Sequence, residues 1–253
     1  MQLSEISIDS SVSGGSPQLA AYLGVPTGEG PWPAVVMVHE AFGVTDIMKR
    51  QIQRMAASGF LVIMPDLFSA GGARKCLTAT FRAMVSGEGR AYIDIDLARQ
   101  FLLGRPDCTG RVGILGFCMG GGFALMMAGR GFDASSANYG RLPKDMDSIL
   151  AGACPIVGSY GGRDDSLKGA AARLETTLVS HGVIHDVKEY HTAGHSFLND
   201  SESGPVLLRP ILRRVLGAGP DPVAAADAWH RIDAFFGEHL GAPGDATGSN
   251  LSH

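Results

Sequence analysis

The sequence lacks a hydrophobic run long enough to cross a membrane and lacks any dense cluster of basic residues. A membrane-spanning helix needs roughly 18 apolar residues in succession, and no stretch of the 253 residues reaches that length. Lysine and arginine are scattered along a chain whose net charge is −4. Proteins that bind nucleic acid or anionic lipid usually carry a concentrated positive patch. We therefore expect neither nucleic acid nor membrane among the partners of this protein.

Two further signals are missing. The segment Met1 to Ser10 has neither the basic flank nor the apolar core of a secretory signal, which predicts a cytoplasmic protein. Cys76, Cys108, Cys118 and Cys154 occur without CxxC spacing, which argues against a zinc site and against a disulfide framework. We expect reduced thiols, one of which could be reactive, and we expect no metal.

What remains is the composition of a folded protein. Hydrophobic residues make up 45% of the chain and charged residues 18%, which excludes a disordered polypeptide. Neither an internal repeat nor an internal linker is visible, so residues 1–240 are predicted to form a single domain. The segment 241–253 is polar and rich in glycine and serine, and it is predicted to be a disordered tail.

Short apolar runs alternate with helical patterns along the chain. This alternation predicts an α/β fold with a mostly parallel central sheet and helices on both of its faces. An antiparallel pair is expected to precede it, at Leu3 to Ile8 and Gln18 to Gly24. The other predicted strands contain Ala34 to Val38, Leu61 to Met64, Val112 to Leu115, Ala153 to Val157 and Val183 to Glu189. The predicted helices are Thr45 to Gly59, Met119 to Gly131, Ser166 to His181 and Pro222 to Leu240.

The strand around Val112 to Leu115 runs into the sequence Gly116-Phe117-Cys118-Met119-Gly120, which opens a helical pattern. A strand–turn–helix of the form Gly-x-nucleophile-x-Gly is typical of a nucleophile elbow, where glycines make room for a strained turn. A buried cysteine in a glycine-rich packing turn would look the same in isolation. The strand–helix context favours Cys118 as a nucleophile.

A cysteine nucleophile needs a base and an acid that orients the base, and in this fold they follow the nucleophile in the order acid, histidine. Asp164 lies in a turn after the strand at Ala153 to Val157 and is the predicted orienting acid, with Asp165 as the second choice. One of the two could instead cap the next helix, a role that suits Asp165. His195, in a loop after Val183 to Glu189, is the predicted base.

The end of the strand at Ala34 to Val38 brings a further loop to the same edge of the sheet. Its sequence is His39-Glu40-Ala41-Phe42-Gly43. The backbone N–H groups of Ala41 and Met119 are expected to form an oxyanion hole. Glu40 would lie beside the thiol, either as part of the site or as an exposed loop carboxylate, since a negative charge there disfavours the thiolate.

Taken together, these segments resemble the dienelactone hydrolase family. The resemblance rests on His39-Glu40-Ala41-Phe42-Gly43, Gly116-Phe117-Cys118-Met119-Gly120-Gly121, Tyr160-Gly161-Gly162-Arg163-Asp164 and Ala193-Gly194-His195-Ser196-Phe197, and it extends to about Leu240. It implies an α/β-hydrolase that cleaves a small ester or lactone through a thioester acyl-enzyme, without a cofactor, as a monomer or weak homo-oligomer. It also implies a Cys118–His195–Asp164 triad and a Glu40 that interacts with the resting thiol.

The resemblance suggests substrate contacts as well, and it includes one departure. Tyr139, Phe42 and Phe197 are expected to contact substrate, although Tyr139 could equally be a packed aromatic residue. Family members bind a substrate carboxylate with an arginine shortly after the catalytic histidine, where this chain has Asp200. A carboxylate there would repel an anionic substrate, so dienelactone itself is doubtful on this reasoning.

Other anion contacts, and other functions, follow from the sequence. The stretch Gly71 to Gly89 is predicted to form a lid, which together with the residue after it would offer cationic contacts at Arg74, Lys75, Arg82 and Arg90. The missing arginine favours a general carboxylesterase or thioesterase for small uncharged acyl groups. A non-catalytic ligand-binding protein on the same scaffold is the third alternative.

Overall fold

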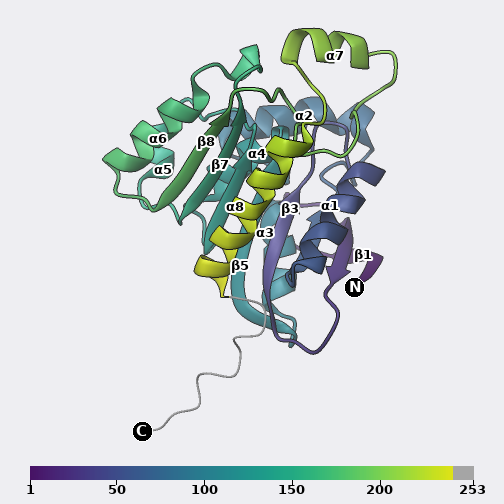
Figure 1. Ribbon diagram of the computed structural model, residues 1–253. Helices are drawn as coiled ribbons and strands as arrows, with labels where there is room; N and C mark the ends of the chain where they lie inside the picture. The colour runs from purple at the N-terminus through teal and green to yellow at the C-terminus, as the bar shows by residue number, and fades with distance from the viewer. Residues whose placement is uncertain (242–253) are drawn as a thin grey trace, which may run out of the picture.

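The computed structural model describes residues 1–241, whose backbone is built around one eight-stranded sheet (Figure 1). The strand order is β1-β2-β4-β3-β5-β6-β7-β8. Strands β1 and β2 pair antiparallel, β2 joins β4 antiparallel, and all remaining neighbours are parallel. The strands are β1 Gln2–Asp9, β2 Gln18–Val25, β3 Trp32–Val38, β4 Leu61–Pro65, β5 Cys108–Phe117, β6 Ala134–Asn138, β7 Ile156–Gly161 and β8 His185–Tyr190.

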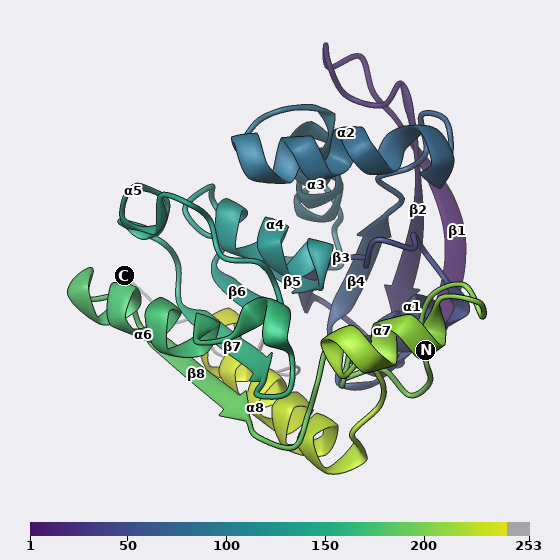
Figure 2. The same cartoon turned by 90° about the horizontal axis from the view of Figure 1, so that it is seen from above.

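Helices cover both faces of this sheet, and the view from above separates them (Figure 2). One face is covered by α1 and α8, the other by α3, α4 and α6, and α2 packs outside α3 and α4. The helices are α1 Asp46–Ala57, α2 Ala73–Ser86, α3 Arg90–Leu103, α4 Met119–Met127, α5 Met146–Leu150, α6 Ala170–Ser180, α7 Arg209–Leu216 and α8 Pro222–Leu240, with a short 3-10 helix η1 at Asp165–Leu167. The predicted α/β-hydrolase architecture is confirmed.

Most elements lie where the sequence predicts them. Helix α8 has the predicted bounds, and Trp229, Ile232 and Phe236 are buried along it. Helix α1 begins after Thr45, whose side chain accepts a hydrogen bond from the amide of Met48 as an N-cap should. The predicted tail lies, beyond Gly241, outside the described residues.

Three predictions about elements need correction. The helix predicted from Ser166 to His181 is split into η1 and α6 by Gly169, which takes a left-handed conformation with φ of 70°. The helix predicted from Met119 to Gly131 ends earlier, at Met127. The stretch Gly71 to Gly89 is largely the regular helix α2, and it is followed directly by α3, which the sequence analysis did not identify.

Strand β6 was not among the predicted strands, because its residues are Ala-Ser-Ser-Ala-Asn and not large apolar ones. All five are buried between β5 and β7. Their polar groups find partners inside the protein: the Ser135 hydroxyl donates to the Ala124 carbonyl, and the Asn138 amide donates to the Gly116 carbonyl and to Ser136. Small, internally bonded side chains let α4 lie close to the sheet.

Candidate active site

Cys118 lies at the junction of β5 and α4, in a turn that few residues tolerate. Its φ is 54° and its ψ is −113°, although it is not glycine. Strained backbone of this kind costs roughly 1–3 kcal/mol and is concentrated at functional sites. The turn is held by a hydrogen bond from the Cys118 amide to the Asn138 carbonyl, 3.1 Å long. The thiol is half-buried at the carboxyl edge of the sheet.

Two glycines make this elbow possible. A Cβ atom on Gly116 would lie 1.9 Å from the Gly120 carbonyl oxygen, and one on Gly120 would lie 2.1 Å from the Val38 carbonyl oxygen. Backbone therefore meets backbone on both sides of Cys118, and no side chain fits between. The close approach brings the end of β3, with Glu40 and Ala41 just beyond it, next to the start of α4.

His195 and Asp164 come together from the loops that follow β8 and β7. The imidazole Nδ1 lies 2.5 Å from Asp164 Oδ2. Asp164 Oδ1 accepts hydrogen bonds from the amide and the hydroxyl of Ser166, at 3.1 and 2.6 Å. Asp165 is exposed, and Asp164 both contacts the histidine and caps η1. The expectation that one acid orients the histidine while the other, Asp165, suits the cap is therefore corrected.

The protonation of this pair is set by opposing effects. Burial lowers the pKa of His195, but the neighbouring Cys118 and the hydrogen bonds to Asp164 and Cys118 outweigh it and raise that pKa to about 10. Burial acts on Asp164 in the opposite direction to its hydrogen bonds with His195 and Ser166, which hold its pKa below the usual value. The arrangement favours an imidazolium between a carboxylate and the thiol sulfur.

Glu40 is buried in the site rather than exposed, but its partner differs from the one that the resemblance implies. Its side chain accepts a hydrogen bond of 2.9 Å from the amide of Asn199. Within residues 1–241 it makes no hydrogen bond to Cys118, whose sulfur instead acts on His195 and raises the pKa of the imidazole. Burial raises the pKa of Glu40 and is only partly offset by hydrogen bonds, of which that from Asn199 is the largest. A protonated Glu40 would not repel a thiolate.

The two amides expected to form the oxyanion hole are available. In the part of the chain that the structure describes, neither the Ala41 N–H nor the Met119 N–H donates a hydrogen bond to another residue. Met119 is the first residue of α4, where amides have no acceptor within the helix. These N–H groups are therefore free to donate hydrogen bonds to an oxygen that develops negative charge, without losing an existing acceptor.

A cavity of about 600 Å³ opens onto Cys118, Met119 and His195. Cys118, Met119, Tyr139 and His195 line it, and α2 contributes Phe81 and Met84, as a lid would. Three cationic residues also line it, none of them singled out from the sequence: Arg141 and Lys144 follow β6, and Arg173 lies on α6. No carboxylate lines the cavity, and none within residues 1–241 forms an ion pair with these three residues.

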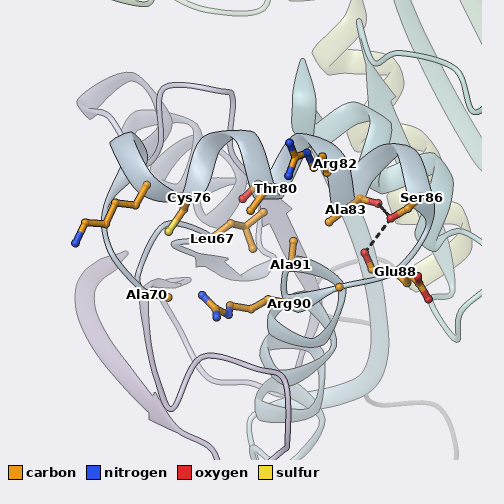
Figure 3. A pocket seen from close by; sticks show the side chains of 13 residues that line it. Leu67, Ala70, Cys76, Thr80, Arg82, Ala83, Ser86, Glu88, Arg90 and Ala91 are labelled. Atoms are coloured by element: carbon orange, nitrogen blue, oxygen red, sulfur yellow. Dashed lines mark hydrogen bonds between the residues drawn. The ribbon is translucent and has the colours of Figure 1, made fainter.

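The predicted effect of Asp200 and the predicted lid cations need correction. Asp200 does not line the catalytic cavity and forms a two-point ion pair with Arg50, at 2.5 and 2.8 Å. Arg74 borders a different cavity. Lys75, Arg82 and Arg90 line a third cavity, between α2 and the start of α3, where Arg82 and Arg90 are seen on different sides of α2 (Figure 3). None of these four cationic residues lines the catalytic cavity.

The three aromatic residues predicted to contact substrate lie in different places. Tyr139 lines the catalytic cavity, with its ring centroid 5.1 Å from that of His195. Phe42 borders the cavity next to it. Phe197 is fully buried against Tyr139 and Tyr190 and cannot touch substrate in this structure. It supports Tyr139 instead, so the prediction for Phe197 was wrong.

Comparison with known proteins places the chain in a family. The family model described as "Dienelactone hydrolase family" matches residues 19–240. The chain belongs to the dienelactone hydrolase family. It is 26% identical over 197 residues to a carboxymethylenebutenolidase of Pseudomonas putida, covering 74% of this chain and 83% of the relative. This dienelactone hydrolase-like chain is accordingly a hydrolase.

Solved structures agree at the level of the fold. A dienelactone hydrolase from Anabaena variabilis superposes with a TM-score of 0.62 at 20% identity, covering 93% of this chain and 99% of that one. A dienelactone hydrolase-like promiscuous phosphotriesterase from metagenomic libraries superposes with a TM-score of 0.74 at 21% identity, covering 94% of this chain and 99% of that one.

Among residues 1–241, no group of three or more histidine, cysteine, aspartate or glutamate residues is placed to hold a metal ion. No described helix combines the length and the hydrophobicity needed to span a bilayer.

The elbow provides a first prediction. Gly120→Ala should destabilise the protein by about 1–3 kcal/mol, because the new methyl group overlaps the Val38 carbonyl. At about 2–4 °C per kcal/mol, the melting temperature should fall by several degrees. Gly237→Ala in α8 is the matched control, since a Cβ there meets nothing within 4 Å. It should leave the melting temperature unchanged or raise it, and an equal loss in both variants would contradict the close approach.

His195 provides a second prediction. Because the pKa of His195 is raised from 6.5 to about 10, its stabilisation of the fold is complete below pH 6.5 and is lost as the pH rises through about 10. Asp164→Asn removes a cause of the shift and should lower that pKa, measured by NMR of the His195 ring. Asp165→Asn, at an exposed carboxylate, is the control. An unchanged His195 titration in Asp164→Asn would refute the assignment.

Proposed function

We propose that this protein hydrolyses a small carboxylic ester or lactone by nucleophilic attack of Cys118. The observation that carries the proposal is the chain of contacts from the Cys118 thiol through His195 to Asp164, at the floor of a cavity. Nucleophile, base and orienting acid are the three groups that covalent acyl transfer requires. The Pseudomonas putida relative, named as a carboxymethylenebutenolidase, supports the same class of reaction.

The first half of the reaction forms a thioester. The Cys118 thiolate attacks the carbonyl carbon while the carbonyl π electrons move to oxygen, where the N–H groups of Ala41 and Met119 stabilise the negative charge. Collapse of the tetrahedral intermediate breaks the carbon–oxygen bond of the ester. The His195 imidazolium donates its Nε2 proton to the departing alkoxide, and Asp164 holds the ring through Nδ1. A lactone would open without releasing a separate alcohol.

The second half returns the enzyme to its starting state. Neutral His195 removes a proton from water as the water attacks the thioester carbonyl. The second tetrahedral intermediate expels the Cys118 thiolate, and the carboxylic acid product leaves. The raised pKa of Glu40 favours a neutral carboxyl group beside these charges, so it need not oppose thiolate formation at neutral pH.

The cationic lining favours a substrate that carries a negative charge. Arg141, Lys144 and Arg173 line the cavity from which Cys118 is reached, and no carboxylate lines it. The relative's name describes a butenolide with a carboxymethylene group, which is an anionic lactone at neutral pH. Such a substrate would meet these residues without the arginine that is missing after the histidine. The cavity thus favours an anionic lactone or ester over the uncharged esters of the esterase alternative.

The nucleophile can be tested directly. Cys118→Ala should lower kcat for p-nitrophenyl acetate by at least about a thousandfold, because it removes the attacking atom. Cys108→Ser is the matched control, at another half-buried cysteine outside the site. A stoichiometric thioester, trapped by acid quench and detected by mass spectrometry, should map to Cys118. Full turnover in Cys118→Ala would refute the mechanism, and no turnover or labelling in the wild type would favour a binding scaffold.

The anionic subsite can be tested by comparing a charged ester with a neutral one. Replacing Arg141, Lys144 and Arg173 together with glutamine should lower kcat/KM for mono-methyl glutarate relative to methyl butyrate by about tenfold, since each exposed pair contributes about 0.2–1 kcal/mol. The wild-type preference should also weaken as salt increases. Arg82→Gln, an exposed arginine outside this cavity, is the control. An unchanged ratio in the triple variant would exclude the subsite.

A further inference from the structure

A second cavity is lined in part by Ala41 but contains neither Cys118 nor His195. Its volume is about 810 Å³, compared with about 600 Å³ for the catalytic cavity. Both volumes lie within the range of about 300–1,000 Å³ typical of small-molecule sites. Its apolar lining includes Phe42, Ile47, Leu77 and Leu208. It is therefore large enough for a substituent of several carbon atoms.

Helix α2 connects the two cavities. Leu77 lines the second cavity, whereas Phe81 and Met84 line the catalytic one. These residues are four and three positions apart, so they lie along one stripe of the helix. The two cavities consequently lie under successive turns of the same helix face.

Ala41 places the second cavity beside the reacting carbonyl. The amide of Ala41 is one of the two donors assigned to the oxyanion, and Ala41 with Phe42 also lines the second cavity. Cys118 and His195 line the catalytic cavity. A carbonyl held between Cys118 and the Ala41 amide would have one cavity on each side, one for each substituent of the ester.

The segment that leads into α7 provides the outer wall, through Leu208 and Arg209, the first residue of the helix. Leu208 is 45% exposed, and Ile211 and Val215 of α7, which do not line the cavity, are 59% and 57% exposed. At its other end α7 is tied to the catalytic loop, because the His195 amide donates to the Leu216 carbonyl at 3.0 Å. The apolar wall is thus fixed relative to the proposed base.

Most of the charged residues that border the second cavity already have a partner in an ion pair or a hydrogen bond. Arg50 pairs with Asp200, Glu202 pairs with Arg213, and Arg209 donates to the Gly204 carbonyl at 3.1 Å. This differs from the catalytic cavity, whose three cationic residues have no carboxylate partner among residues 1–241. The charge pattern favours an anion in the catalytic cavity and an apolar group in the second one.

We propose that the second cavity binds an apolar alkyl or acyl arm of the substrate, so that the enzyme accepts extended esters that are anionic at one end and apolar at the other. The proposal rests on the hydrolase function proposed above and deepens it. The scissile carbonyl would lie between the two cavities, with the negative charge toward Arg141 and the apolar arm toward Leu77 and Leu208. A small lactone would leave the second cavity unused.

Two ester series test the proposal. The first lengthens the alcohol side, from mono-methyl to mono-butyl to mono-hexyl glutarate, and the second lengthens the acyl side, from p-nitrophenyl acetate to butyrate to hexanoate. In at least one series kcat/KM should rise by about tenfold or more from the shortest to the longest ester, because each buried methylene favours binding. Leu208→Glu should lower the ratio of longest to shortest by a similar factor, since it puts a charge on the wall.

The controls separate this proposal from the function on which it rests. Leu207→Glu changes the adjacent residue, which is 90% exposed and does not line the cavity, and should keep the wild-type ratio. Leu208→Met should keep it too. A flat profile in both series, or equal ratios in Leu208→Glu and Leu207→Glu, would overturn the second site while Cys118-dependent hydrolysis of the shortest esters stood. Absence of turnover on every ester would overturn both.

Discussion

The site depends on a close approach of backbone to backbone at the carboxyl edge of the sheet. Helix α4 begins so near to β3 and β6 that a Cβ on Gly120 would overlap the Val38 carbonyl and one on Gly121 would come within 2.6 Å of the Asn138 carbonyl. Gly140, two residues after β6, permits the same approach from its side, since a Cβ there would lie 2.3 Å from the Gly121 carbonyl carbon. Larger side chains at these positions would move α4 outward, and with it Cys118 and the Met119 amide.

This geometry brings buried ionisable groups close together, and opposing effects set the pKa of each one. The pKa of His195 is raised by its neighbours, although burial lowers it. The pKa of Glu40 is raised by burial, although its hydrogen bonds lower it. The two residues therefore both tend toward their protonated forms, one as a cation and one as a neutral acid. The hydrogen bonds from His195 and Ser166 keep the pKa of Asp164 low, so the negative charge lies on the carboxylate that holds the histidine ring.

The sequence predicted those features of the fold and the site that are marked by a pattern of neighbouring residues. Cys118 and Asp164 follow predicted strands that are apolar runs, His195 follows a more polar predicted strand, and each of the three lies in a turn that contains glycine. Their position at one edge of the sheet could therefore be expected. The bounds of α8 followed from Pro222 and its buried aromatic residues. Strand β6 could not be recognised because burial of serine and asparagine depends on partners elsewhere, such as the Ala124 carbonyl. Asn199, which holds Glu40, carried no motif that would have marked it.

The charges that line the catalytic cavity were harder to predict than the strands, because they come from loops that are distant in sequence and adjacent only in the fold. Arg141 and Arg173 are 32 positions apart in sequence and reach the same cavity only because β6 and β7 are neighbours in the sheet. Asp200 illustrates the converse: its place after His195 suggested repulsion of an anion, but Arg50 on α1 pairs with it outside the cavity. In the function proposed above, the strand ends place the reacting groups, whereas the connections after β6, the helix α2 and the segment leading into α7 line the cavities that would receive the substrate. Chemistry and specificity would then be carried by separate parts of the same sheet edge, so that changes in the second set would leave the first in place.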